Sequence, residues 1–213
     1  ADENNADGLR RQGDRPPPRS GSVFGKDIFE RATTAFDPIT AGPVDAVYRL
    51  GIGDALQLIV TGEVEIAYQL ELRRDGTVVI PQVGQVSLAG LTLDAARALL
   101  KSRMSASLSG LATGVARLDV SIARVRSNAV FVIGEVENPG AFQVNALATV
   151  FHAIARAGGP TNRGSFRDIE VRRANKVIER LDLYEYLVRG NASGDIRLEQ
   201  GDVVYVPLNR RVI

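Results

Sequence analysis

The chain has 213 residues, of which 45% are hydrophobic and 24% are charged, so one or two folded domains with a true core are expected. Its formal net charge of +1 argues against a surface dedicated to nucleic acid. The absence of cysteine excludes disulfides, thiolate-bound zinc, iron–sulfur ligation, thiol nucleophiles and a lipid-bearing cysteine within the chain. No apolar run approaches the roughly 18 residues of a membrane-spanning helix, and no signal-peptide pattern is present.

The first part of the chain divides into a polar tail and a more apolar lead-in. Residues 1–22 are polar, contain three consecutive prolines and are predicted to form a disordered tail, for which a plain tether is favoured over a ligand for an SH3-type domain. Residues 23–43 contain several phenylalanines. The spacing of Phe24, Ile28 and Phe29 predicts one short helix that lies on a neighbouring surface.

Residues 44–126 are predicted to form a first small module, which opens on a turn and a strand. Gly53 and Asp54 are typical of a tight backbone reversal. Residues 55–60 are rich in side chains that favour β-structure. The turn should therefore lead directly into a buried strand.

A hairpin and a helix are expected next. Residues 68–72 alternate apolar and polar, and Asp75-Gly76 predicts a hairpin turn into a strand at 77–80. Thr92 suits the N-cap of a helix. One face of that helix is apolar and carries Leu93, Ala96, Leu99, Leu100 and Met104.

The first module is predicted to end with a loop and a long strand, and part of its sequence resembles part of the second module. Residues 105–114 are small and polar and predict a loop, whereas 116–125 alternate cleanly and predict a long strand with one wet face. Residues 78–86 and 130–136 share a strand, a glycine and a following valine, and a helix is expected after each. The likeness predicts two related α+β modules in tandem.

Residues 127–208 are predicted to form the second module, and 209–213 a short tail. Asn145 is expected to cap a helix that ends at Gly158-Gly159. Its inward side chains would be Leu147, Val150, Phe151 and Ile154.

The rest of the second module predicts a hairpin, a short helix and a last strand. Residues 169–172 and 177–181 form the hairpin, and 184–188 the helix. Gly201-Asp202 then precedes the strand at 203–207, as Gly53-Asp54 precedes its own strand.

Catalytic constellations are not found. The single histidine, His152, lies on a predicted helix without a serine nucleophile motif, and its expected role is structural. The glutamate pairs at 63–65 and 135–137 are interpreted as surface charge, and no phosphate-binding glycine loop occurs. We therefore expect binding or assembly, with no enzymatic activity, no metal and no cofactor.

Cationic side chains are in excess around the second hairpin. A solvated hairpin is the simpler interpretation, and contact with an anionic polymer or an acidic neighbouring subunit is the alternative. Aromatic residues are not interleaved with these charges, so single-stranded nucleic acid is not expected. The candidate contact residues are Arg163, Arg167, Arg172, Arg173 and Lys176.

Three segments of the first module resemble a known domain. Residues 48–56, YRLGIGDAL, resemble the opening Y-x-L-G-x-G-D-x-L of the polysaccharide biosynthesis/export domain. Residues 75–84, DGTVVIPQVG, are similar to its D-G-x-I-x-x-P-x-x-G segment. Residues 90–96, GLTLDAA, match its helix entry G-L-T-x-x-x-A.

The second module resembles another domain of the same proteins. Residues 132–140, VIGEVENPG, resemble the V-x-G-x-V-x-x-P-G signature of the soluble-ligand-binding β-grasp (SLBB) domain. Residues 157–161 and 198–207 match its later A-G-G and L-x-x-G-D-x-x-x-V-P segments. The motif residues to which the resemblance gives structural roles are Gly51, Gly53, Asp54, Asp75, Gly76, Pro81, Gly84, Gly134, Pro139, Gly140, Gly158, Gly159, Gly201, Asp202 and Pro207.

The family implied is the outer-membrane polysaccharide export proteins of Gram-negative bacteria. The resemblance implies an α+β fold, with an export-domain sheet and one main helix followed by a β-grasp-like SLBB domain. It also implies a periplasmic homo-oligomeric ring that carries capsular or exopolysaccharide across the outer membrane by passive passage. An inner-membrane polysaccharide co-polymerase is the implied partner.

The chain differs from the family pattern in carrying no lipid-bearing cysteine, no further β-grasp repeat and an extra phenylalanine-rich segment. We therefore expect a portion of a larger exporter, joined to the membrane by parts outside it and not inserting itself. The alternative is a β-grasp module that binds a small soluble ligand or a protein partner. A polysaccharide-cleaving enzyme has no supporting site.

Overall fold

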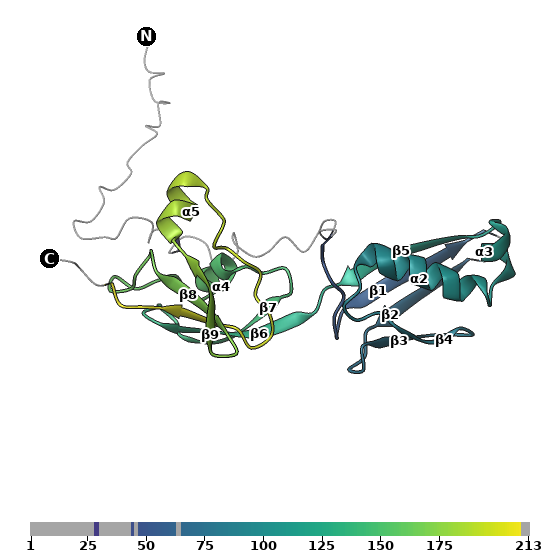
Figure 1. The fold of residues 1–213 in the computed structure, drawn as a ribbon, viewed down its shortest axis with the longest axis horizontal. Helices are drawn as coiled ribbons and strands as arrows, with labels where there is room; N and C mark the ends of the chain where they lie inside the picture. The colour runs from purple at the N-terminus through teal and green to yellow at the C-terminus, as the bar shows by residue number, and fades with distance from the viewer. Residues whose placement is uncertain (1–27, 30–43, 45–46, 63–64, 210–213) are drawn as a thin grey trace, which may run out of the picture.

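The computed structural model describes residues 28–29, 44, 47–62 and 65–209. Two bodies, each with its own sheet and its own core, lie end to end and are joined where the fifth strand leads into the sixth (Figure 1). The expected α+β class with two small modules in tandem is confirmed.

The first module is built on a three-stranded antiparallel sheet with β1 in its centre. β1 (Ala55–Thr61) pairs with β2 (Ile66–Glu71) on one side and with β5 (Arg117–Arg124) on the other. The helix α2 (Leu93–Ser105) begins at Thr92, whose side chain accepts a hydrogen bond from the backbone N–H of Ala95, as predicted. It packs its apolar face onto the sheet, and its buried side chains are Ala96, Leu100 and Met104.

The hairpin expected at Asp75-Gly76 is wrong. β3 (Thr77–Ile80) pairs with β4 (Gly84–Ser87) in a separate two-stranded sheet and has no ladder with β2. The turn is real, since Asp75 accepts hydrogen bonds from the backbone and hydroxyl of Thr77, but it redirects the chain. Buried side chains of both β2 and β3 still contribute to one core.

The loop expected over 105–114 is also wrong in part. The structure places a short helix, α3 (Ser109–Thr113), within it. Leu111 is the buried residue of this helix, and Gly114 ends it in the left-handed conformation. One buried leucine in a polar stretch is too short a signal for helical periodicity.

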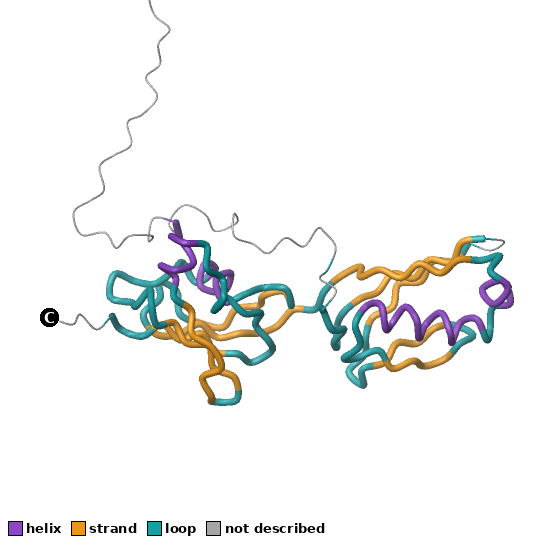
Figure 2. Tube along the Cα trace, turned by 45° about the horizontal axis from the view of Figure 1, so that its top comes forward, coloured by secondary structure: helices purple, strands orange, loops and turns teal. Residues whose placement is uncertain are grey.

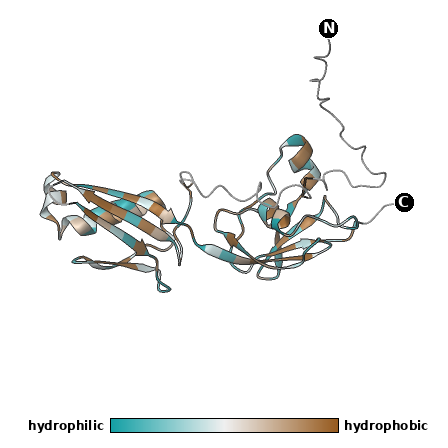
Figure 3. Ribbon diagram, turned by 180° about the vertical axis from the view of Figure 1, so that it is seen from behind, coloured by the Kyte–Doolittle hydropathy of each residue, from teal (hydrophilic) through white to brown (hydrophobic). Residues whose placement is uncertain are grey.

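The second module contains a five-stranded mixed sheet in the order β7-β6-β10-β8-β9. β10 (Val203–Val206) runs parallel to β6 (Ser127–Gly134) and antiparallel to β8 (Ile169–Arg173). The edges are β7 (Gly140–Asn145) and β9 (Lys176–Leu181). The predicted hairpin and last strand are therefore confirmed, and apolar residues run along the strands of both bodies (Figure 3).

The two short helices of the second module contribute to its core. α4 (Val150–Arg156) turns buried Phe151 and Ile154 toward the sheet, and α5 (Leu183–Arg189) follows β9. The helices of both bodies are marked in Figure 2. Asn145 does not cap α4: it ends β7, and its side chain accepts from the N–H of Leu147. The N-cap is Thr149, in a capping box closed by His152.

Phe29 docks on the second module, as the predicted short helix on a neighbouring surface requires. Its ring is 4% exposed and lies 5.7 Å from that of Phe151. A Cβ at Gly159 would approach Cγ of Phe29 to 2.6 Å, so the glycine makes room for this ring. The rest of the lead-in, the tail at 1–22 and residues 210–213 lie outside the described residues.

The likeness between 78–86 and 130–136 does not reflect equivalent places in the fold. Gly84 begins a strand of the two-stranded sheet, whereas Gly134 ends an inner strand of the five-stranded sheet. A Cβ at Gly134 would collide with the carbonyl oxygen of Val206 on β10. The shared pattern therefore arises from different packing demands.

Candidate functional site

The two Gly-Asp turns have the same local geometry. In each, the glycine has a positive φ, +91° in the first and +84° in the second. Asp54 accepts a hydrogen bond from the N–H of Gly51 at 2.7 Å, and Asp202 accepts one from the N–H of Glu199 at 2.8 Å. Both aspartates are fully buried. Two buried carboxylates therefore stand at the starts of two strands, where each needs a cation.

Asp54 is held by the segment that joins the modules. Arg126, between β5 and β6, donates its backbone N–H to Oδ1 at 2.6 Å and its Nη1 to Oδ2 at 3.1 Å. The hydroxyl of Tyr48 donates to the same carboxylate at 2.7 Å. Burial, and then the nearby Asp54 carboxylate, raise the pKa of Tyr48 well above its usual range.

Residues that follow β7 also take part in the contact between the two modules, which we call the joint. The carbonyl of Arg126 accepts the N–H of Ala146 at 2.9 Å, and both Ala146 and Leu147 pack into the core of the first module. A Cβ at Gly51 would come within 2.6 Å of the guanidinium carbon, so this motif glycine leaves space for the arginine. The segment 48–54, which carries the Y-x-L-G-x-G-D motif, thus forms a binding site for Arg126 in the linker between β5 and β6, and we call this site the socket. Sequence analysis missed Arg126, which lies outside every quoted motif.

Asp202 is held from within its own module. Arg173 at the end of β8 donates Nε and Nη2 to its two carboxylate oxygens, each at 2.8 Å, and Nη1 lies 2.8 Å from Glu199. The hydrogen bonds with Asp202 raise the pKa of Arg173 above its ordinary value. Arg173 is one of the candidates for contact with an anionic polymer or a neighbouring subunit, and here it forms a bidentate pair with a buried carboxylate.

Two more of the predicted contact arginines are also paired. Arg172 donates to Glu170 at 2.7 Å, an interaction that lowers the pKa of that carboxyl, and it lies 4.9 Å from the ring of Tyr205. Arg167 lies 3.5 Å from Asp182. Arg163 and Lys176 remain exposed. The predicted basic surface is therefore a set of local ion pairs with cations at its edge.

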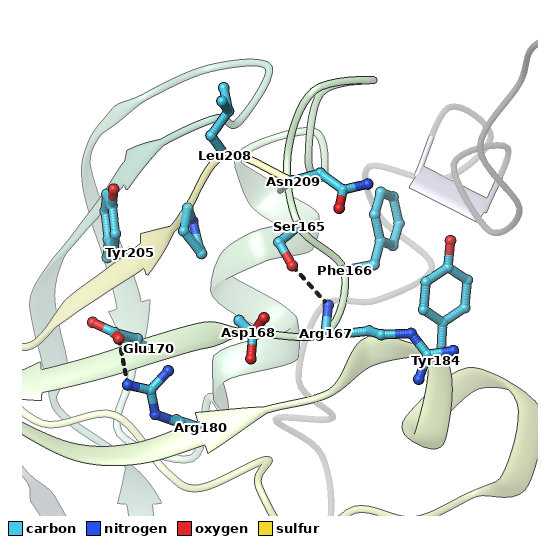
Figure 4. A pocket seen from close by; sticks show the side chains of 11 residues that line it. Ser165, Phe166, Arg167, Asp168, Glu170, Arg180, Tyr184, Tyr205, Leu208 and Asn209 are labelled. Carbon is cyan, nitrogen blue, oxygen red and sulfur yellow. Dashed lines mark hydrogen bonds and ion pairs between the residues drawn. The ribbon is translucent and has the colours of Figure 1, made fainter. Parts of the chain in front are cut away.

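A polar recess opens beside these pairs, at the end of the five-stranded sheet (Figure 4). Its volume is about 830 Å³. Aromatic rings, two arginines and two carboxylates line it together with a loop before β8 and the segment after β10. The lining residues are Ser165, Phe166, Arg167, Asp168, Glu170, Arg180, Tyr184, Tyr205, Pro207, Leu208 and Asn209.

The remaining motif residues lie in turns and at strand ends. Pro81 lies in the turn between β3 and β4, Pro139 precedes β7, and Pro207 follows β10. Gly140 begins β7. The motif glycines with positive φ are Gly53, Gly76, Gly84, Gly134, Gly158, Gly159 and Gly201.

Metal-ligating side chains do not cluster among the described residues. None of their histidines and acids form a group of three that could hold a metal ion. The ring of His152 lies 2.6 Å from the hydroxyl of Thr149 and so serves the N-terminus of α4.

Comparison with known proteins identifies both modules. Residues 42–121 match the family described as "Polysaccharide biosynthesis/export protein", and residues 128–206 match the SLBB domain. The chain belongs to the polysaccharide export protein family. The resemblance stated from the motifs is confirmed in both modules and in their order.

Two curated relatives are similar to the chain over most of its length. Both are named "Polysialic acid transport protein KpsD" and come from Escherichia coli; each is 29% identical over 192 residues, or 90% of this chain. Those residues are 33% of each relative, so the chain spans about a third of the length of the relatives it matches. Within the described ranges, no helix is long and apolar enough to cross a membrane.

Proposed function

We propose that this polysaccharide export protein is a periplasmic, ring-forming portion of an exporter that carries capsular or exopolysaccharide across the outer membrane. The observation that carries the proposal is the tandem of the two family domains, joined through the socket around Asp54. The relatives' name, which refers to transport of a polysaccharide, supports the same substrate class.

Passage through the ring is passive in this proposal. Identical subunits meet side to side through a heterologous interface that closes by rotation. A hydrated glycan then slides along polar walls, because strong binding would hold it in place. The fixed joint supports this arrangement, since two linked modules can form two stacked layers only if every copy holds the same angle between them.

Subunit contacts are proposed on the outer face of the five-stranded sheet. Phe131 and Ile133 project from β6 with 44% and 41% of their surface exposed, and the rim at 134–140 follows them. Exposed apolar residues gathered on one face favour a protein contact. Arg163 and Lys176, both exposed, remain candidates for contacts with the lumen or with the neighbouring subunit.

The partners follow from the same assignment. Other copies of the chain and the glycan are the direct ones, and an inner-membrane polysaccharide co-polymerase supplies the polymer. The modules themselves do not insert into the membrane, bind nucleic acid or catalyse a reaction, and parts of the exporter outside this chain attach it to the outer membrane.

Two measurements test the proposal. Deletion of the gene should abolish surface polysaccharide while polymer accumulates inside the cell, and the intact gene should restore export. In the purified exporter, changing Phe131 and Ile133 to serine should lower the assembly mass, whereas Val188→Ser, at a more exposed apolar site on α5, should not. Normal surface polysaccharide in the deletion strain would contradict the function. Saturable binding of a small cofactor would favour the alternative of a ligand-binding β-grasp module.

A further inference from the structure

The polar recess of the second module is held open by backbone hydrogen bonds. The N–H of Ser165 donates to the carbonyl of Pro207 at 2.8 Å, and the N–H of Asn209 donates to that of Arg163 at 2.6 Å. The N–H of Leu183 donates to Phe166 at 2.7 Å and ties α5 to the same wall. The walls therefore need no ligand to form, which is typical of binding sites.

One face of the Tyr205 ring is turned toward this recess. Arg172 lies opposite Val203 in the ladder, and its guanidinium covers one ring face at 4.9 Å. Pro207 lies two residues beyond Tyr205 in the other direction and lines the recess. The ring stands at the edge of the recess in Figure 4. A ligand in the recess would thus meet the ring face that Arg172 does not cover.

Among the described residues that line the recess, both arginines have an acidic partner, and one carboxylate, that of Asp168, is left as a hydrogen-bond acceptor. Arg180 is paired with Glu170 at 2.7 Å, and Arg167 lies 3.5 Å from Asp182. The Asp168 side chain is exposed, and it makes no hydrogen bond or ion pair with another residue drawn in Figure 4. An ionised carboxylate only accepts hydrogen bonds. The Asp168 carboxylate therefore favours a ligand that donates hydrogen bonds and disfavours an anionic one.

From these observations we infer that the recess binds an uncharged, hydroxyl-rich sugar unit. The apolar C–H face of a pyranose would stack on Tyr205, and its hydroxyl groups would donate to Asp168. An apolar ligand would leave this carboxylate and the two ion pairs without water, at a large cost. The inference rests on the proposed function and narrows its substrate to neutral sugar units, in contrast to the polysialic acid in the name of the relatives.

Binding of one sugar unit should be weak. A ligand of this size with a few polar contacts has a dissociation constant on the order of 1 mM. Such affinity is compatible with passage, because each unit leaves the recess quickly while the polymer stays near the wall.

Titration of the isotope-labelled chain with maltotetraose, cellotetraose and mannotetraose, followed by NMR, tests the inference. We expect saturable shifts around the recess with at least one of these neutral probes. Tyr205→Ala should weaken that binding about tenfold by removing the stacking surface, whereas Tyr205→Phe should retain it. Asp168→Asn should weaken it about threefold to tenfold. Asp119→Asn, an exposed carboxylate on β5, is the matched control.

A sialic acid trimer completes the test, because Arg210 and Arg211 follow Asn209 directly in the sequence. Binding of this trimer as tight as that of the best neutral probe would overturn the inference, and so would neutral binding that Tyr205→Ala leaves unchanged. If no probe binds while gene deletion abolishes export, the recess assignment fails and the function stands. If the neutral probes bind as expected while deletion leaves export intact, the function fails and the recess assignment stands.

Discussion

The two Gly-Asp turns differ in the origin of the arginine that neutralises the aspartate. Around Asp202 the cation is Arg173, 29 positions away and within the same module. Around Asp54 it is Arg126, 72 positions away in the segment that leads into the next module. The turn at Asp202 therefore stabilises the second module internally, whereas the turn at Asp54, with the same local geometry, fixes the connection between the two modules.

The difference has an energetic side. Asp54 receives a backbone N–H and a guanidinium from Arg126 and the hydroxyl of Tyr48, and the arginine side chain is 26% exposed. The Arg173 side chain is 35% exposed and has a second acidic partner in Glu199. A buried charge that loses its partners costs more where water cannot replace them. The first turn should therefore be the more sensitive.

The largest effect is expected from Asp54→Ala, which leaves Arg126, Tyr48 and the Gly51 N–H without their acceptor. The cost should be about 3–5 kcal/mol in the first module. Hydrogen exchange of backbone amides reads the two modules separately. Asp202→Ala should cost less, about 2–3 kcal/mol, in the second module. Asp119→Ala, on an exposed face of β5, is the control, and equal losses from the two buried aspartates would contradict the comparison.

Arg126→Ala should loosen the angle between the modules. With the guanidinium absent, the buried charge of Asp54 keeps only its hydrogen bonds, and we expect a loss of about 3 kcal/mol. Because the chain has no cysteine, spin labels can be placed on both modules through Ser102→Cys and Ser193→Cys, two exposed sites. The distribution of distances between the labels should broaden.

The matched variants for this measurement are two other arginines. Arg173→Ala removes the equivalent cation of the second turn and should leave the inter-module distances narrow. Arg124→Ala removes only a surface ion pair with Glu71, with both side chains more than 60% exposed, and should change little. An unchanged distribution in Arg126→Ala would show that Ala146 and Leu147 alone hold the joint.

Strong local patterns allowed most elements of both modules to be predicted. Thr92 caps α2 because its hydroxyl meets a free N–H, and positive φ angles at Ala174 and Asn175 make the second hairpin turn. The two Gly-Asp turns were also recognised, since a positive φ and a buried carboxylate are properties of a short segment. These features depend on neighbours in the sequence.

Features that depend on distant parts of the chain were missed. Arg126 acquires its role from Asp54, which no local spacing indicates. The N-cap of α4 is Thr149 and not Asn145, and Leu147 between them packs on the core of the first module. Among the candidate contact residues, Arg173 is paired with the buried carboxylate of Asp202, which directly precedes β10. The recess likewise combines segments before β8 and after β10. Its residue Asp168 lies outside all the quoted motifs.

Gly53→Ala and Gly201→Ala should have nearly equal effects. Each forces an alanine to a positive φ, at about 1–2 kcal/mol. A Cβ would lie 3.6 Å from Arg126 at the first site and would meet nothing within 4 Å at the second, so neither adds a clash. Thermal unfolding of both variants measures this. A much larger loss at Gly53 would mean that the turns differ in their backbone as well as in their arginine.

The smallest effect should come from Tyr48, a partner that only the first turn has. Tyr48→Phe removes one hydrogen bond to Asp54 and should cost about 1 kcal/mol at neutral pH. The raised pKa of Tyr48 in the folded chain means that its neutral phenol is favoured there. Its contribution is complete below the unfolded pKa of about 10 and is lost as the pH rises toward the folded value. The unfolding free energy should therefore fall less steeply above about pH 10 in Tyr48→Phe than in the unmodified chain, with Tyr205→Phe as the control, and parallel slopes in all three proteins would contradict this role for the phenol.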